Sequence, residues 1–503
     1  MATSSAQAQT LQLHVDISNG STSGDGLAWG SAKKYIQDAL DEADAWLDIN
    51  QQGIVHIHVA AGIYRPDQGS GYTLGDRAAS FQLRNNVHLY GGYDGTGMTP
   101  RNWVSNPTIL SGDLDEDDER NELVSGPQYW LSPANYDENS HHVVLAENVT
   151  ESAVLDGFII EGGSSYLDGL DSLGGGGMLA IDAAPIVRNC FFRWNLGPVT
   201  PGAGLNAGGA GIHVRASTSM AAPIRIEHTR FESNLVWKGG GAGLYAGPST
   251  FVVAIGCDFY HNQVTVVTDE PGDPPPAKNG GAGVRVESEE AYFVNCSFRD
   301  NQITEDAIVA DTAAGFEAKY AGDLYFWNCL FARNRSYDTS GHGGLYLSAD
   351  RVEMVNCTIA DNQGADSNHA GGFYCPFELD ELVVHNSIVW GNSGTDAMVF
   401  ANTNNTITHS NVQDSGWSGN GNISVDPEFV YPLTYDYRIR ATSDCVDAGD
   451  NDVLPCDYFD ISPTSLGLPD ATCPNEQKIP VDLAWIARVI GGTVDMGAYE
   501  NDD

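Results

Sequence analysis

The chain has 503 residues, of which 42% are hydrophobic, and its 67 acidic and 24 basic side chains give a formal net charge of −43. An electrostatic field of this sign repels nucleic acid and anionic membranes, so we expect neither as a partner. No stretch approaches the run of about 18 apolar residues that a membrane-spanning helix needs. The sequence therefore predicts no transmembrane segment.

The N-terminal part of the chain lacks a regular repeat. Residues 1–11 are expected to form a disordered tail or the remnant of an export signal, because the triplet AQA at 6–8 resembles the small-residue end of a secretory signal. Residues 12–150 are expected to hold an N-terminal cap and irregular first coils. An apolar stripe at helical spacing over 35–47 predicts a helix that covers the open end of the fold, with Ser31 as its N-cap.

An acidic run at 111–121 reads SGDLDEDDERN. It places Asp113, Asp115 and Asp117 at alternating positions, as calcium-binding loops do. It lacks the glycine and the terminal glutamate of an EF-hand loop, so a solvated loop without a metal is the alternative. Calcium is thus the one ion that the sequence suggests, and no cofactor is required. A weaker candidate of the same kind lies at Asp447, Asp450 and Asp452.

Residues 151–426 repeat one pattern at intervals of 28 to 39 residues. Each repeat has a small anchor residue, a large apolar residue two positions later and an asparagine five positions later. The anchors are Cys190, Thr229, Cys257, Cys296, Cys329, Cys357 and Ser387. The asparagines are Asn195, Asn234, Asn262, Asn301, Asn334, Asn362 and Asn392.

The residues before each anchor predict a sharp corner in the chain. The position directly before it is usually asparagine, which tolerates left-handed backbone geometry, and the position three before it is apolar. The positions three before the anchor, at the anchor and two after it cannot all face one side of a straight strand, because side chains alternate along a strand, so the strand must bend. A glycine-rich segment such as GGAGL at 240–244 opens a third strand in each repeat. The pattern predicts an all-β, parallel β-helix, a three-sheet solenoid whose coils stack like residue on like.

The cysteines at 257, 296, 329 and 357 are expected to form a single file of small apolar side chains inside this solenoid. A metal or redox role is the alternative, although interior thiols lack the exposed, basic setting of reactive cysteines.

Two further segments leave the repeat pattern. The proline-rich insert at 268–280 predicts a protruding loop. Residues 427–503 are expected to form a C-terminal cap. Within that cap, Cys456 and Cys473 predict a surface disulfide, provided that the compartment is oxidising.

The alternation of GGAG plus an apolar residue with Phe-x-x-Asn resembles the repeat of the chlamydial polymorphic outer-membrane proteins and of the wider right-handed parallel β-helix repeat family. Segments such as LYGGYDGT, AVLDGFIIEGG and the closing VDMGAYE resemble large secreted bacterial proteins described as choice-of-anchor or β-helix repeat proteins. The likeness covers roughly residues 12–500. It implies a right-handed β-helix and a secreted or cell-surface, bacterial extracellular location.

Candidate binding residues follow the glycine-rich segments. The side chains two and four positions beyond the last glycine are expected to face solvent on adjacent coils. Aromatic faces stack on sugars, and charged side chains pair with polar groups of a ligand. The candidate glycan-binding residues are His213, Tyr245, Arg285, Glu287, Glu317, Lys319, Tyr346 and Tyr374. An ordinary exposed strand face with neutralising charge pairs is the plainer alternative.

These observations favour a secreted or cell-surface scaffold for adhesion, whose partner is an extracellular polysaccharide, matrix component or other surface partner. An extracellular polysaccharide-active enzyme, a glycoside hydrolase or lyase, is one alternative, with Glu287 and Glu317 as the candidate carboxylate pair. The sequence has no nucleophile motif, phosphate loop or zinc spacing, which favours binding over catalysis. A structural protein that associates with itself is the other alternative.

Overall fold

The structure is a computed structural model. It describes residues 9–118, 135–165, 174–198, 208–237, 239–265, 280–304, 312–337, 341–399, 404–413, 417, 419–455, 481–490 and 492–501. Most of the predicted N-terminal tail, nearly all of the predicted loop at 268–280, and Cys456 and Cys473 lie outside the described residues. The chain divides into two compact units, residues 1–250 and 251–503, which are taken in turn.

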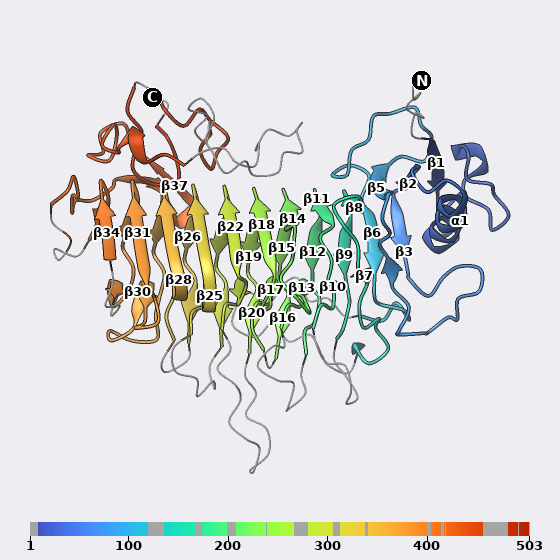
Figure 1. Ribbon diagram of the computed structural model, residues 1–503, viewed down its shortest axis with the longest axis horizontal. Coiled ribbons are helices and arrows are strands. Elements are labelled where there is room, and N and C mark those ends of the chain that lie inside the picture. The colour runs from blue at the N-terminus through green and yellow to red at the C-terminus, as the bar shows by residue number, and fades with distance from the viewer. Residues whose placement is uncertain are drawn as a thin grey trace, which may run out of the picture. The chain divides into compact units, whose positions relative to one another are not determined.

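Unit 1 consists of parallel strands from successive coils (Figure 1). Its first sheet contains β4 (Phe81–Gln82), β7 (Val144–Glu147), β10 (Met178–Ile181), β13 (Ile212–Arg215) and β17 (Leu244–Ala246). Its second sheet contains β1 (Thr10–Val15), β2 (Ile54–Ala60), β5 (Val87–Tyr93), β8 (Val154–Asp156), β11 (Ile186–Arg188) and β14 (Ile224–Glu227). Its third sheet contains β3 (Gly62–Tyr64), β6 (Thr108–Ser111), β9 (Ile159–Glu161), β12 (Phe191–Arg193) and β15 (Arg230–Glu232). A short strand, β16 (Leu235–Val236), follows β15.

The predicted helix is α1 (Ile36–Ile49), which packs against β1, β2 and β4. Its buried face includes Ala39, Leu40 and Ala43, so the predicted apolar stripe is confirmed. The predicted N-cap is wrong. Ser31 lies in the 3-10 helix η1 (Trp29–Ser31), where its hydroxyl donates to Asp25 Oδ1 at 2.6 Å. The N-cap position of α1 is Tyr35, four residues after Ser31, and it makes no side-chain cap hydrogen bond.

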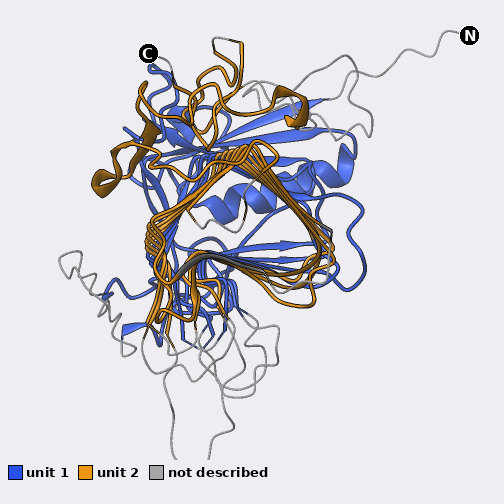
Figure 2. Cartoon of the chain, turned by 90° about the vertical axis from the view of Figure 1, so that its left-hand side faces the viewer, with its two compact units in different colours: residues 1–250 blue, residues 251–503 orange. Residues whose placement is uncertain are grey.

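Unit 2 repeats the same arrangement, and Figure 2 shows its coils superimposed as straight sides joined by corners. Its first sheet contains β21 (Val284–Val286), parts of β25 (Phe316–Trp327) and β28 (Leu345–Val355), β30 (Ala370–Cys375) and β33 (Thr395–Val399). Its second sheet contains β18 (Phe251–Ile255), β22 (Glu290–Val294), the remainder of β25 and β28, β31 (Glu381–His385) and β34 (Asn404–Thr408). Its third sheet contains β19 (Asp258–Tyr260), β23 (Ser297–Arg299), β26 (Leu330–Ala332), β29 (Thr358–Ala360), β32 (Ile388–Trp390) and β35 (Asn411–Val412).

Unit 2 also contains a fourth row of short strands that the sequence pattern does not predict. The row contains β20 (Gln263–Val264), β24 (Gln302–Ile303) and β27 (Arg335–Ser336), which pair in parallel. Each follows the asparagine of its repeat, so the chain continues to pair for two residues before it enters the variable loop.

The interior of unit 2 confirms the predicted stacking of like on like. The thiols of Cys296, Cys329 and Cys357 are fully buried, and each donates to a backbone carbonyl of the preceding coil, at 3.4, 3.1 and 3.2 Å. Because these three thiols make the same contact one coil back, they lie in single file, and Cys257 is buried at the same position of its own repeat. Phe298 stacks between two phenylalanines of the neighbouring coils, with ring centroids 5.0 and 4.5 Å apart. These contacts confirm a parallel β-helix.

The asparagines form a ladder of hydrogen bonds along unit 2. Asn301 Nδ2 donates to Asn334 Oδ1 at 2.9 Å, and the backbone N–H of Asn301 donates to the same oxygen at 3.1 Å. Asn334 repeats both bonds to Asn362, at 2.9 and 3.0 Å. All three side chains are buried. At the predicted corners, residues such as Asn328 have a positive φ, here 53°, which confirms the left-handed geometry.

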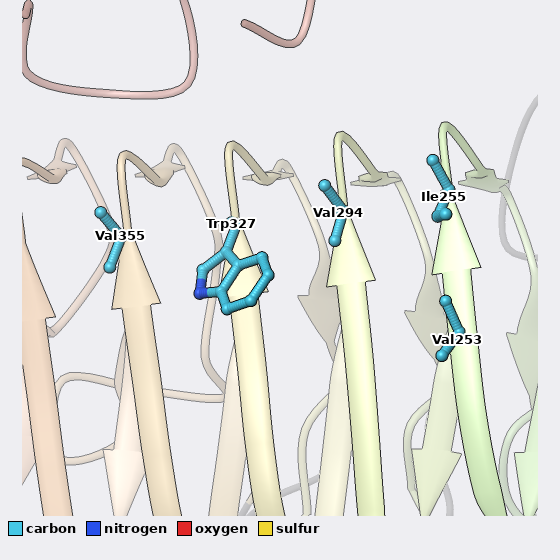
Figure 3. Packing of buried hydrophobic residues seen from close by; sticks show 5 residues of the cluster. All are labelled: Val253, Ile255, Val294, Trp327 and Val355. Atoms are coloured by element: carbon cyan, nitrogen blue, oxygen red, sulfur yellow. The ribbon is translucent and has the colours of Figure 1, made fainter. Parts of the chain in front are cut away.

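The C-terminal part of unit 2 covers outward-facing side chains of the coils. Figure 3 shows five of these on successive strands of the second sheet: Val253, Ile255, Val294, Trp327 and Val355. Val481 packs against this cluster. On the third sheet, Ala332 and Ala360 pack against Tyr437 of β37 (Asp436–Ile439). β37 pairs antiparallel with β36 (Phe429–Tyr431) across the 3-10 helix η4 (Pro432–Thr434), and η5 (Asn451–Val453) follows.

Candidate functional site

The candidate glycan-binding residues of unit 1 are buried. His213 and Tyr245 lie on β13 and β17 with ring centroids 4.8 Å apart, and neither is more than 1% exposed. A hydrogen bond of 2.9 Å joins His213 Nδ1 to the carbonyl of Gly208, in the preceding glycine-rich segment. Burial lowers the pKa of His213 to about 4, so the ring is neutral near pH 7. The expectation that these two side chains face solvent is wrong, because the glycine-rich segment packs against them.

In unit 2 the charged candidates form a partly buried ion-pair group. Arg285 Nη2 lies 2.6 Å from Glu287 Oε1, and Arg285 Nη1 lies 3.6 Å from Glu317 Oε2. Glu317 also accepts the backbone N–H of Gly280 at 2.6 Å, and burial raises its pKa. Arg285 and Glu317 are thus buried, contrary to the prediction, whereas Glu287 and Lys319 are half-buried.

Tyr346 and Tyr374 are half-buried and stack on neighbouring coils with centroids 5.5 Å apart. His342 continues the stack at 4.1 Å from Tyr374. Because half of the eight candidates are enclosed, the face is not one open surface. A role of its more exposed members in glycan binding stays a prediction.

A cleft that the sequence did not predict lies between the third sheet of unit 2 and the β36–β37 hairpin. It has a volume of about 550 Å³. We call it the C-terminal cleft, and its lining residues are Asp361, Trp390, Gly391, Asp426, Glu428, Phe429, Pro432 and Arg440. It therefore combines two aromatic rings with three carboxylates and one guanidinium.

Repeat strands position one wall of the cleft. Trp390 is the last residue of β32, and Asp361 directly follows β29, one coil earlier. Tyr437 donates its hydroxyl to Asp361 Oδ2 at 2.9 Å, which ties this wall to the hairpin. Partial desolvation by its neighbours raises the pKa of Asp361, although the residue as a whole is exposed, while the hydrogen bond from Tyr437 and the charge of Arg333 act in the opposite direction.

The hairpin forms the other wall. The backbone N–H of Glu428 donates to Asp426 Oδ1 at 2.9 Å, and its carbonyl accepts the N–H of Arg440 at 3.2 Å. The Thr442 hydroxyl donates to the Glu428 carboxylate. Glu428 has φ of 51°, a left-handed conformation that is costly for a residue with a Cβ and is kept here by these bonds.

The one sequence signal for this cleft is a change in residue type at the outward position three residues after each anchor. It is large or charged at Arg193, Glu232, Tyr260 and Arg299 and then becomes Ala332 and Ala360. Small apolar residues at an outward position indicate that another segment packs there. Trp390 follows at the same position of the next repeat.

The acidic run forms a different group from the predicted one. Asp113, Asp117, Asp118 and Glu138 each offer a carboxylate oxygen, and these four atoms all lie within 4.8 Å of one another. Asp115 is exposed and is not a member of this group. Burial, followed by the charges of nearby aspartates, raises the pKa of Glu138 to about 7.

Asp447, Asp450 and Asp452 serve local structure. Asp450 caps η5 by accepting the backbone N–H of Asp452 at 2.9 Å, and the N–H of Asp447 donates to Asp495 Oδ1 at 2.7 Å. In the part of the chain that the structure describes, no cluster with metal-ligand geometry includes these three aspartates.

Comparison with known proteins agrees with the fold. Residues 210–412 match the family model of the right-handed β-helix region. No curated protein matches the chain. The fold is therefore a right-handed parallel β-helix. Within the described ranges, no helix has the length and apolar character needed to cross a membrane.

Proposed function

We propose that this protein is a secreted or cell-surface β-helix scaffold that binds glycans through the C-terminal cleft. The observation that carries the proposal is the lining of that cleft, where Trp390 and Phe429 stand among three carboxylates and Arg440. Aromatic rings pack against the apolar faces of sugar rings, and charged oxygens and guanidinium groups bond their hydroxyls. A cleft of about 550 Å³ has the size of an ordinary small-ligand site.

The charge of the cleft narrows the class of ligand. Three carboxylates face one arginine in its lining, and the whole chain carries a net charge of −43. A polymer of uronic acids would be repelled both by the carboxylates of the cleft and by the net negative charge of the whole chain. Neutral sugars and amino sugars are therefore the expected ligands.

The fold supports a rigid site. Trp390 extends from a strand that pairs with β29, and the hairpin is fixed by packing of Tyr437 against Ala332 and Ala360. Since both walls rest on stacked coils, little ordering is needed when a ligand binds, and a small cleft can then retain useful affinity. The resemblance to secreted bacterial repeat proteins supports the proposed location and a role in adhesion.

A glycan array tests this proposal with the full chain and two variants. Trp390→Ala removes the aromatic wall and is expected to weaken binding by about tenfold, equivalent to about 1.4 kcal/mol. Trp103→Ala, at an exposed tryptophan of unit 1, is the matched control and should bind like the unmodified chain. No binding to any neutral or amino sugar, or equal binding by the two variants, would overturn the proposal.

A polysaccharide-active enzyme is the second candidate, and Asp361 is the observation that favours it. A carboxylic acid with a raised pKa beside other carboxylates suits a general acid in glycoside hydrolysis. The pair expected from the sequence suits it less well, because Glu317 is buried against Arg285. Incubation of each bound glycan with the protein and with Asp361→Asn, followed by assay of reducing ends, separates enzyme from binder. Product from the unmodified chain alone would establish the enzyme.

Self-association, the third role expected from the sequence, stays a prediction. Sedimentation velocity over a hundredfold range of protein concentration tests it directly. A single monomeric species throughout would leave glycan binding as the sole basis of adhesion.

A further inference from the structure

The four clustered carboxylates of unit 1 have the spacing of a cation site. Ligand oxygens lie about 2.3–2.6 Å from a Ca²⁺ ion, so two oxygens on opposite sides of it are about 5 Å apart. The carboxylate oxygens of Asp113, Asp117, Asp118 and Glu138 all fall within 4.8 Å of one another. One ion can therefore contact all four.

A buried amide next to the cluster provides an independent observation. Asn139 is 0% exposed, and its Nδ2 donates to Asp118 Oδ2 at 3.1 Å, so its amide group is in contact with the cluster. Its Oδ1 is enclosed and has no hydrogen-bond partner. An enclosed carbonyl oxygen without a donor destabilises the folded chain, and coordination of a cation would satisfy it. One oxygen of Glu138, Oε1, is enclosed and without a partner in the same way.

The backbone holds the cluster in place from several sides. Arg65 Nε donates to the carbonyl of Asp113 at 2.8 Å, and the N–H of Asp117 donates to Asp113 Oδ1 at 3.2 Å. Asn139 Nδ2 also donates to the carbonyl of Gly162 at 2.7 Å. Asp113, Asp117 and Asn139 are thus held by hydrogen bonds to the coils that carry β6 and β9.

We propose that Asp113, Asp117, Asp118 and Glu138, with the Oδ1 of Asn139, bind one Ca²⁺ ion. Calcium fits this set because all of the ligands are oxygens and their number leaves room for water, and because calcium accepts irregular coordination, whereas magnesium requires near-ideal octahedral geometry. The site lies in unit 1 and is independent of the C-terminal cleft.

Isothermal titration calorimetry with CaCl₂ tests the site on the full chain after removal of divalent ions, in buffer with about 0.15 M NaCl to screen diffuse binding. One ion per chain is expected to bind with saturation. Asp118→Asn replaces a charge with an isosteric amide and should weaken binding at least tenfold. Asp115→Asn is the matched control, because it removes one charge from the same acidic run outside the cluster, and should change affinity less than twofold.

A second variant tests the contribution of the neutral ligand, Asn139, without changing the charge of the site. Asn139→Ala keeps all four carboxylates and should weaken binding several-fold, with circular dichroism without calcium confirming that each variant is folded. Absence of saturable heat from the unmodified chain would overturn the proposal. Equal weakening by Asp115→Asn and Asp118→Asn would also overturn it, since diffuse attraction to an acidic surface would then be sufficient.

Discussion

Removal of one asparagine from the ladder of unit 2 should destabilise it by an amount that can be worked out from its bonds. The Asn334 side chain makes four buried hydrogen bonds: it donates to Phe298 O and Asn362 Oδ1, both at 2.9 Å, and it accepts two from Asn301, at 3.1 and 2.9 Å. In Asn334→Ala the backbone N–H of Asn301 loses this acceptor, at a cost of about 1–3 kcal/mol. The other three bonds contribute about 0.5–1 kcal/mol each, which gives a total of about 2.5–6 kcal/mol.

Hydrogen exchange measured by mass spectrometry suits this prediction, because a repeat structure can open locally. Peptides that contain Asn301 should lose protection by about a hundredfold or more, equivalent to the lower end of that range. Asn368→Ala is the control, since Asn368 is exposed, and should leave protection within about threefold. A loss at Asn301 no larger than in the control would refute the reasoning that the side-chain ladder, and not the backbone ladder alone, holds the coils together.

Three further predictions concern packing, thiols and pH. Phe298→Ala should lower the free energy of unfolding in urea by about 3–5 kcal/mol, because it empties a stacked interior position. Phe377→Ala, at a ring that is 69% exposed, should lower it by under about 1 kcal/mol. Equal losses of stability in the two variants would contradict the stacked interior. Cys329 is fully buried with a raised pKa, so Ellman's reagent should label it only after unfolding, and labelling within minutes in native buffer would contradict the interior file. Burial raises the pKa of Glu500 from 4.5 to about 7, so between these pH values the folded state binds more protons than the unfolded state. The free energy of unfolding should therefore fall as pH rises from 4.5 to about 7, by up to about 3 kcal/mol. Glu500→Gln should flatten that profile, and an unchanged profile would assign it to another group.

The interior of the β-helix was predictable because each repeat supplies the same side chain to the same place. Cys296 and Asn301 reappear in every neighbouring coil at fixed offsets, and a residue that stacks on its own kind constrains the fold several times over. α1 was predictable from its apolar stripe. Its N-cap was not, because the bond from Ser31 to Asp25 depends on the tertiary path of the preceding loop.

The exterior was less predictable, because the repeat pattern tells which side chains face inward and says little about what covers the others. Tyr245 and Glu317 stand at positions that face out of the strand, yet both are buried. The C-terminal cleft was missed for a related reason. Asp361, Trp390 and Glu428 come from separate segments, and only the return of the chain over the third sheet brings them together.

The acidic run shows how backbone geometry overrides spacing. Alternation selects Asp115 as a partner of Asp113 and Asp117, as in an extended segment. Glu116 has φ of 63°, so the chain reverses there, and the group that forms contains Asp117 and Asp118 without Asp115. Glu138, from a distant part of the sequence, carries no local signal at all.

The asparagine ladder has a direction. The backbone N–H and Nδ2 of Asn301 find their acceptor on Asn334, which the chain reaches only in the next coil, and Asn334 depends on Asn362 in turn. When the chain is synthesised from its N-terminus, the most recently folded coil therefore has an asparagine whose backbone N–H and Nδ2 still lack acceptors. These donors can bind the asparagine of the next coil as soon as that coil is made. Such a molecule can be assembled layer by layer during synthesis, with each finished layer serving as the template for its successor.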